Sequence, residues 1–68
     1  MKYTVVYEKA PENYAAYVPD LPGCVATGAT LDEVKENIRG AISFHIEGLR
    51  LEREPVPHPQ SWAELVEV

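Results

Sequence analysis

The hydrophobic periodicity of this 68-residue sequence changes at Thr30. Before Thr30, apolar and polar residues alternate in short runs, a pattern that is typical of β-strands with one buried face. After Thr30, apolar residues recur every three or four positions, as they do along one face of an α-helix. Short strands followed by one long amphipathic helix predict a single α+β domain that covers residues 1–68.

Three short strands are expected before the helix, separated by turn-forming residues. Aromatic and β-branched residues mark the strands, and prolines, asparagine and glycines mark the connections between them. Because these connections are short, neighbouring strands are expected to pair antiparallel. The expected strands are residues 2–8, 14–18 and 24–27.

The helix is expected to begin after Thr30 and to end by about Glu54, because Pro55 disfavours helical backbone in the residue before it. Thr30 and Glu33 match a capping box, in which the Thr30 hydroxyl accepts from the Glu33 amide and the Glu33 carboxylate accepts from the Thr30 amide. The apolar face that should pack on the sheet consists of Leu31, Val34, Ile38, Ala41, Ile42, His45, Ile46 and Leu49.

A fourth strand is expected over Leu65–Val68, where apolar and polar residues alternate again. A crossover after the helix would place this strand parallel to the strand that it joins, which we expect to be the first. The predicted order is therefore βββαβ, with one long helix on one face of a small mixed sheet.

Composition excludes several classes of site. One cysteine and two histidines cannot form an intrachain disulfide or a closed four-ligand zinc site from His and Cys, so no metal or other cofactor is expected. The net charge is −5 and the six basic residues form no cluster, which argues against direct nucleic-acid binding and favours a basic partner. No apolar run approaches the roughly 18 residues of a membrane span, and residues 1–9 lack the features of a secretory signal, so the cytoplasm is expected.

The candidate catalytic residues are isolated along the sequence. His45 has no carboxylate or second histidine beside it on the apolar face, and Cys24 has no nearby cation to activate its thiol. The acidic residues Asp32, Glu33 and Glu36 are explained by the helix dipole, which favours negative charge in the first turns. We therefore predict that the protein is not an enzyme.

A second strip of the helix lies away from the apolar face and consists of Gly40, Phe44, Gly48 and Leu51. Glycine in a helix interior costs about 1 kcal/mol relative to alanine, so two glycines flanking a phenylalanine suggest close approach by another element. That element is either a partner or second copy, or another part of the same fold. Simple tolerance of the glycines is a third interpretation.

Residues 14–59 resemble the HicB-like antitoxin family in its short, single-domain form. The resemblance is carried by the PDLPGC block at 19–24, the Gly28-x-Thr30 helix entry and the proline-rich segment 55–59. It implies a partial ribonuclease H-like fold without the acidic nuclease site. It also implies a bacterial toxin-antitoxin role, in which the protein sequesters a small basic mRNA-cleaving HicA-type toxin by masking its active surface. Many members continue into a DNA-binding module, which this sequence lacks.

Two sets of contact residues are predicted. The rigid loop Pro19, Asp20, Leu21, Pro22 and Gly23 is expected either to present an exposed Leu21 to the toxin or only to seal the core. A core this small also favours a homodimer, because pairing adds buried area. Its contact is expected at a sheet edge through Leu65, Val66 and Val68, or at the helix strip Gly40, Phe44, Gly48 and Leu51. The alternative function is a stand-alone structural or regulatory homodimer with no toxin partner.

Overall fold

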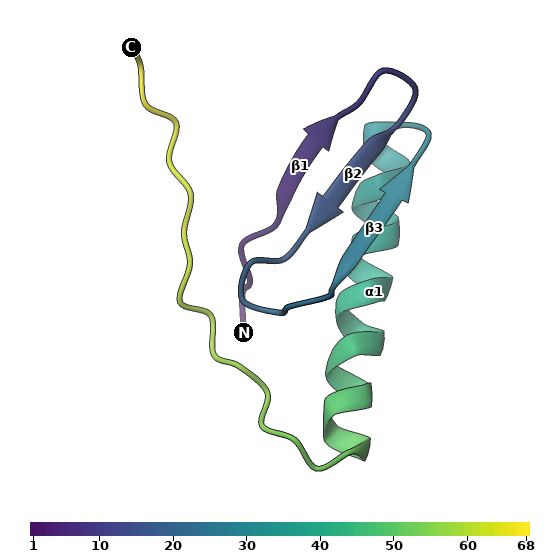
Figure 1. The fold of residues 1–68 in the computed structure, drawn as a ribbon, viewed down its shortest axis with the longest axis vertical. Helices are drawn as coiled ribbons and strands as arrows, with labels where there is room; N and C mark the ends of the chain where they lie inside the picture. The colour runs from purple at the N-terminus through teal and green to yellow at the C-terminus, as the bar shows by residue number, and fades with distance from the viewer.

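The computed structural model describes residues 1–68 and contains three strands followed by one helix (Figure 1). The strands form one antiparallel sheet in the order β1-β2-β3, and α1 lies across one of its faces. The elements are β1 (Val6–Lys9), β2 (Tyr14–Tyr17), β3 (Val25–Gly28) and α1 (Leu31–Leu51). The predicted α+β class and the order of these four elements are confirmed. No helix combines the length and the apolar character that crossing a bilayer requires.

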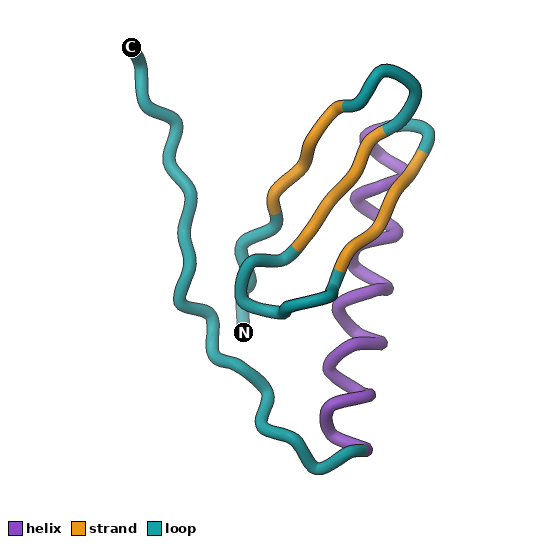
Figure 2. Tube along the Cα trace, viewed as in Figure 1, coloured by secondary structure: helices purple, strands orange, loops and turns teal.

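The predicted strand over Leu65–Val68 is wrong. These residues belong to an extended segment without helix or strand (Figure 2), and the sheet is therefore antiparallel throughout rather than mixed. Three prolines at positions 55, 57 and 59 lack amide donors, and no backbone hydrogen bond joins residues 62–68 to β1. Alternation at the end of the sequence favours an extended backbone, but a strand also needs a paired neighbour. We refer to residues 55–68 as the C-terminal segment.

The strand register separates a buried face from an open one. Ala16 pairs with Tyr7 on one side and with Ala26 on the other, and its side chain is buried on the face toward α1. The next residue, Tyr17, pairs with Val25, and both side chains are exposed on the opposite face. Because successive strand residues point to opposite faces, α1 covers one face of the sheet and leaves the other open.

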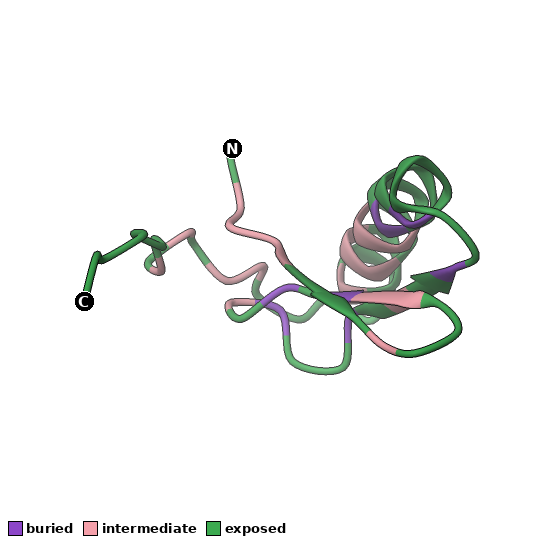
Figure 3. Ribbon diagram, turned by 90° about the horizontal axis from the view of Figure 1, so that it is seen from above, coloured by how far each residue is buried: buried purple, intermediate pink, exposed green.

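The core lies between the sheet and the middle of α1, with additional cover from the loop between β2 and β3 (Figure 3). Val34 and Ile38 supply the helix side, and Ala41, Ile42 and Ile46 pack against the margin, as predicted. Leu31, which was also expected to pack on the sheet, is 39% exposed, and His45 and Leu49 are half-buried outside this cluster. The buried residues of this cluster are Ala16, Val18, Leu21, Cys24, Val34 and Ile38.

The two ends of α1 follow local sequence signals. Thr30 Oγ1 accepts from the Glu33 amide at 3.1 Å, as predicted, but Glu33 Oε1 accepts from the Ala29 amide at 3.3 Å rather than from the Thr30 amide. At the other end Arg53 adopts a left-handed φ of 57°, and the Glu54 amide donates to the Leu49 carbonyl at 2.8 Å. This turn closes the helix within the limit set by Pro55.

Gly28 brings the end of β3 against the first turn of α1. A Cβ built at this position would lie 2.6 Å from the Val34 amide nitrogen. A Cβ at Gly40, within α1, would meet no atom within 4 Å. The two glycines therefore have different structural roles.

We expect Gly28→Ala to destabilise the fold and Gly40→Ala to stabilise it. Overpacking of this kind costs about 1–3 kcal/mol, whereas alanine in an open helix interior gains up to about 1 kcal/mol over glycine. Denaturant unfolding followed by circular dichroism measures both changes. Equal destabilisation by the two substitutions would contradict this account of Gly28.

Candidate partner-binding site

The loop Pro19–Gly23 between β2 and β3 has a fixed backbone. The Val18 amide donates to the Cys24 carbonyl across its base, and the Cys24 amide donates to the Leu21 carbonyl, at 3.2 and 3.0 Å. Gly23 has a φ of 84°, a conformation that other residues rarely adopt. Such a loop loses little conformational freedom when it is bound by a partner.

The prediction that Leu21 is exposed is wrong. Its side chain is 0% exposed and belongs to the core cluster, because the loop folds back and places Leu21 between Val18 and Cys24. Pro19, Pro22 and Gly23 remain exposed and form the tip of the loop. The loop thus seals the core with one residue and leaves three others exposed. Its role in binding a partner stays a prediction.

Asp20 connects this loop to the C-terminal segment. Its Oδ2 accepts from the amides of Gln60 and Ser61, both at 2.9 Å, and its Oδ1 accepts from Ser61 Oγ at 2.9 Å. The two backbone hydrogen bonds stabilise the charged form and lower the pKa of the Asp20 carboxyl below its ordinary value of 3.8. We refer to these contacts as the Asp20 latch.

The N-terminal residues hold the same segment at two further points. Tyr3 Oη donates to the Pro57 carbonyl at 2.6 Å, and Thr4 Oγ1 donates to the Ser61 carbonyl at 2.5 Å. Sequence analysis assigned Asp20 to partner contact and missed the latch, because its hydrogen-bond partners are 40 and 41 residues away. No local pattern in the sequence signals a contact over that separation.

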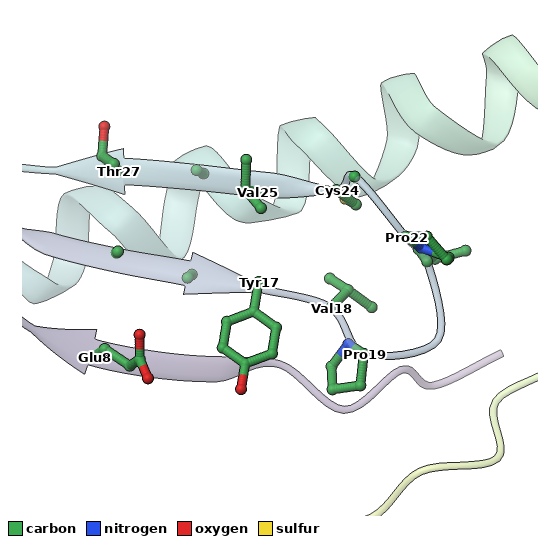
Figure 4. Close-up of a pocket in the computed structure, with 13 residues that line it drawn as sticks. Glu8, Tyr17, Val18, Pro19, Pro22, Cys24, Val25 and Thr27 are labelled. Atoms are coloured by element: carbon green, nitrogen blue, oxygen red, sulfur yellow. The ribbon is translucent and has the colours of Figure 1, made fainter.

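The open face of the sheet contains a pocket of about 540 Å³, which we call the outer groove (Figure 4). Ala15, Tyr17 and Val25 are among the strand residues that line it, and Pro19 and Pro22 border it at the loop. Glu8 is its one charged lining residue. The sequence analysis did not identify this surface.

The sheet edge predicted for a homodimer does not form, because Leu65–Val68 is not a strand, whereas the helix strip is open. On α1, Phe44 is 83% exposed, and Cβ atoms at Gly40 and Gly48 would meet nothing, so no other part of the chain covers the strip. In the C-terminal segment, the residues Leu65, Val66 and Val68 are exposed, and so is Trp62. The interpretation that the fold itself covers the helix strip is therefore wrong.

The groups considered for chemistry are dispersed. Cys24 is buried in the core, and this burial raises the pKa of its thiol, which disfavours the reactive thiolate. Tyr3 and Tyr14 pack against the core, whereas Tyr17 lies on the open face. No group of three His, Cys, Asp or Glu side chains is arranged to hold a metal ion.

A family model and a solved structure point to the same family. The model of the HicB_like antitoxin of bacterial toxin-antitoxin systems matches residues 3–68. An uncharacterized 14.9 kDa protein of Haemophilus phage HP1 is 46% identical over 57 residues, which are 84% of this chain and 43% of that protein. This chain therefore spans less than half the length of the phage protein. The UPF0150 protein of Thermoplasma acidophilum is 43% identical, over 84% of both chains.

A solved structure titled as the HicA3 and HicB3 toxin-antitoxin complex contains a chain with the same fold. The TM-score is 0.75 and the sequence identity is 33%, over 87% of this chain and 70% of that chain. The similarity thus extends beyond the sequence motifs to the arrangement of sheet and helix.

We expect Asp20→Ala to release the C-terminal segment while the sheet and helix stay folded. Amide hydrogen exchange at neutral pH should show lost protection at Gln60 and Ser61, and Glu12→Ala, in the exposed turn between β1 and β2, is the matched control. Because the folded pKa of Asp20 is lowered, the latch contributes fully above the ordinary value of 3.8 and is lost as the pH falls through the folded pKa. Unchanged protection in Asp20→Ala would show that the latch does not hold the segment.

Proposed function

Because the chain belongs to the HicB-like antitoxin family, we propose that it binds a small basic HicA-type toxin in the cytoplasm and masks the toxin's active surface, without catalysis of its own. The observation that carries this proposal is the structural similarity to a chain of a HicA3–HicB3 complex, at 33% identity over 87% of this chain. The net charge of −5 supports it, since an acidic protein attracts a basic one and speeds their encounter.

We propose the tip of the Pro19–Gly23 loop as part of the toxin contact. Pro19, Pro22 and Gly23 are exposed on a backbone that hydrogen bonds already fix. Leu21 supports the tip from the core, and Asp20 ties it to the C-terminal segment. These two residues therefore position the contact rather than touch the toxin.

The test uses a purified HicA-type toxin. We expect binding by calorimetry and loss of the toxin's RNA cleavage in the complex. Pro22→Lys should weaken binding at least about tenfold, equivalent to ~1.4 kcal/mol, because it places a cation against a basic partner. Ala29→Lys, an exposed residue before α1, makes the same change of charge at a distance from the loop and should have a smaller effect.

The possible outcomes separate the two parts of the proposal. Absence of any binding would overturn the antitoxin function. Binding that is weakened equally by the two lysine substitutions would leave the function standing and remove the loop from the contact.

We also propose that the protein forms a homodimer, which is the basis of the alternative function without a toxin. The observation in its favour is the exposure of Leu65, Val66 and Val68 in residues 62–68, the part of the C-terminal segment beyond the Asp20 latch, which is exposed throughout. Large apolar side chains gathered on a surface mark interaction sites more often than single ones do. This segment is favoured over the helix strip because it adds Trp62 to the same stretch.

Sedimentation equilibrium at micromolar concentration should return about twice the chain mass of 7.6 kDa. Deletion of residues 62–68, which removes Trp62 together with Leu65, Val66 and Val68, should return the monomer mass. A monomer of the full chain would contradict the homodimer, and a dimer that survives the deletion would move its contact to the strip that contains Phe44.

A further inference from the structure

We propose that the outer groove of one copy binds the C-terminal segment of a second copy, with Trp62 as its aromatic anchor. This inference rests on the homodimer proposed above and adds the receiving surface and the anchoring residue. The two contacts are equivalent by symmetry, because the C-terminal segment of each copy binds the outer groove of the other.

The first support is that Trp62 directly follows Ser61, a residue that several hydrogen bonds hold in place. Ser61 is held by Asp20 through its amide and its hydroxyl, and by Thr4 through its carbonyl. The next side chain, Trp62, is 85% exposed. Tryptophan is enriched among the residues that dominate protein–protein binding. Because the backbone before Trp62 is already fixed, less conformational entropy is lost when its side chain is buried.

The second support is the character of the outer groove. Its strand residues Tyr17 and Val25 are exposed apolar side chains, with Val25 at 64%, and prolines border it at the loop. Glu8 alone contributes charge, so the groove offers little electrostatic attraction to a basic toxin. Its surface complements an apolar peptide instead.

The course of the C-terminal segment favours a second copy over its own groove. After the Asp20 latch the segment runs along the outer side of β1, whereas the groove lies mainly over β2 and β3 and reaches β1 only at Glu8 (Figure 1, Figure 4). Most of β1 therefore lies between the segment and its own groove. Leu65 and Val68 are completely exposed along this course.

A stable dimer needs a contact of substantial area. A stable interface buries roughly 800 Å² from each partner. Each copy would contribute four large exposed side chains in the segment and the groove that receives their equivalents. The contributing side chains of the segment are Trp62, Leu65, Val66 and Val68.

The test exploits Trp62 as the single tryptophan of the sequence. The experiment dilutes the full chain from micromolar to nanomolar concentration and records tryptophan emission together with sedimentation mass. We expect the emission maximum to move to shorter wavelength as the dimer forms, with the same concentration midpoint in both signals. Val25→Glu should weaken the dimer at least about tenfold and abolish the shift, because it places a carboxylate in the apolar groove.

Leu51→Glu is the matched control, since it replaces an exposed apolar residue by the same carboxylate on the helix strip, and it should leave both signals unchanged. A dimer with exposed Trp62 that Val25→Glu does not weaken would overturn the groove contact and leave the homodimer standing. An emission shift that does not depend on concentration would assign Trp62 to its own groove and overturn the inference. A monomer at every concentration would overturn both the homodimer and the exchange, while toxin binding is tested by its separate assay.

Discussion

The structure depends on the close contact between α1 and one face of a sheet with three strands. Small residues make this contact possible: Ala16 and Ala26 line the face beneath the helix, and Gly28 allows the first turn of α1 to reach β3. Val34 and Ile38 then fill the space between the layers. Because only a few residues are fully buried, every other element is stabilised by its attachment to this contact, and much apolar surface remains at the exterior.

Local patterns predicted the elements well because local physics determines them. The hydroxyl of Thr30 and the position of Pro55 set the limits of α1, and short connections imposed antiparallel pairing. The sequence motifs also predicted the family, which the family model over residues 3–68 confirms. The failures involve tertiary context: alternation at Leu65–Val68 did not create a strand without a paired neighbour, and two flanking prolines did not keep Leu21 at the surface.

The site was predicted less completely than the fold, for the same reason. The sequence marked the Pro19–Gly23 loop as rigid, which the backbone hydrogen bonds confirm. It contained no sign that Asp20 bonds to residues 60–61, or that the outer face of the sheet forms a groove. The latch forms where segments distant in sequence meet, and the groove depends on how side chains of three paired strands pack, so periodicity and spacing reveal neither.

The Asp20 latch has a consequence for the order in which the protein assembles. Its contacts join residues 40 or more positions apart, and those of Tyr3 and Thr4 span 54 and 57 positions, whereas the hairpin and helix contacts are local. Closing a long loop is slower than forming local structure, so the sheet and helix form before the C-terminal segment is attached. The same segment is the first part to detach when the native state opens locally.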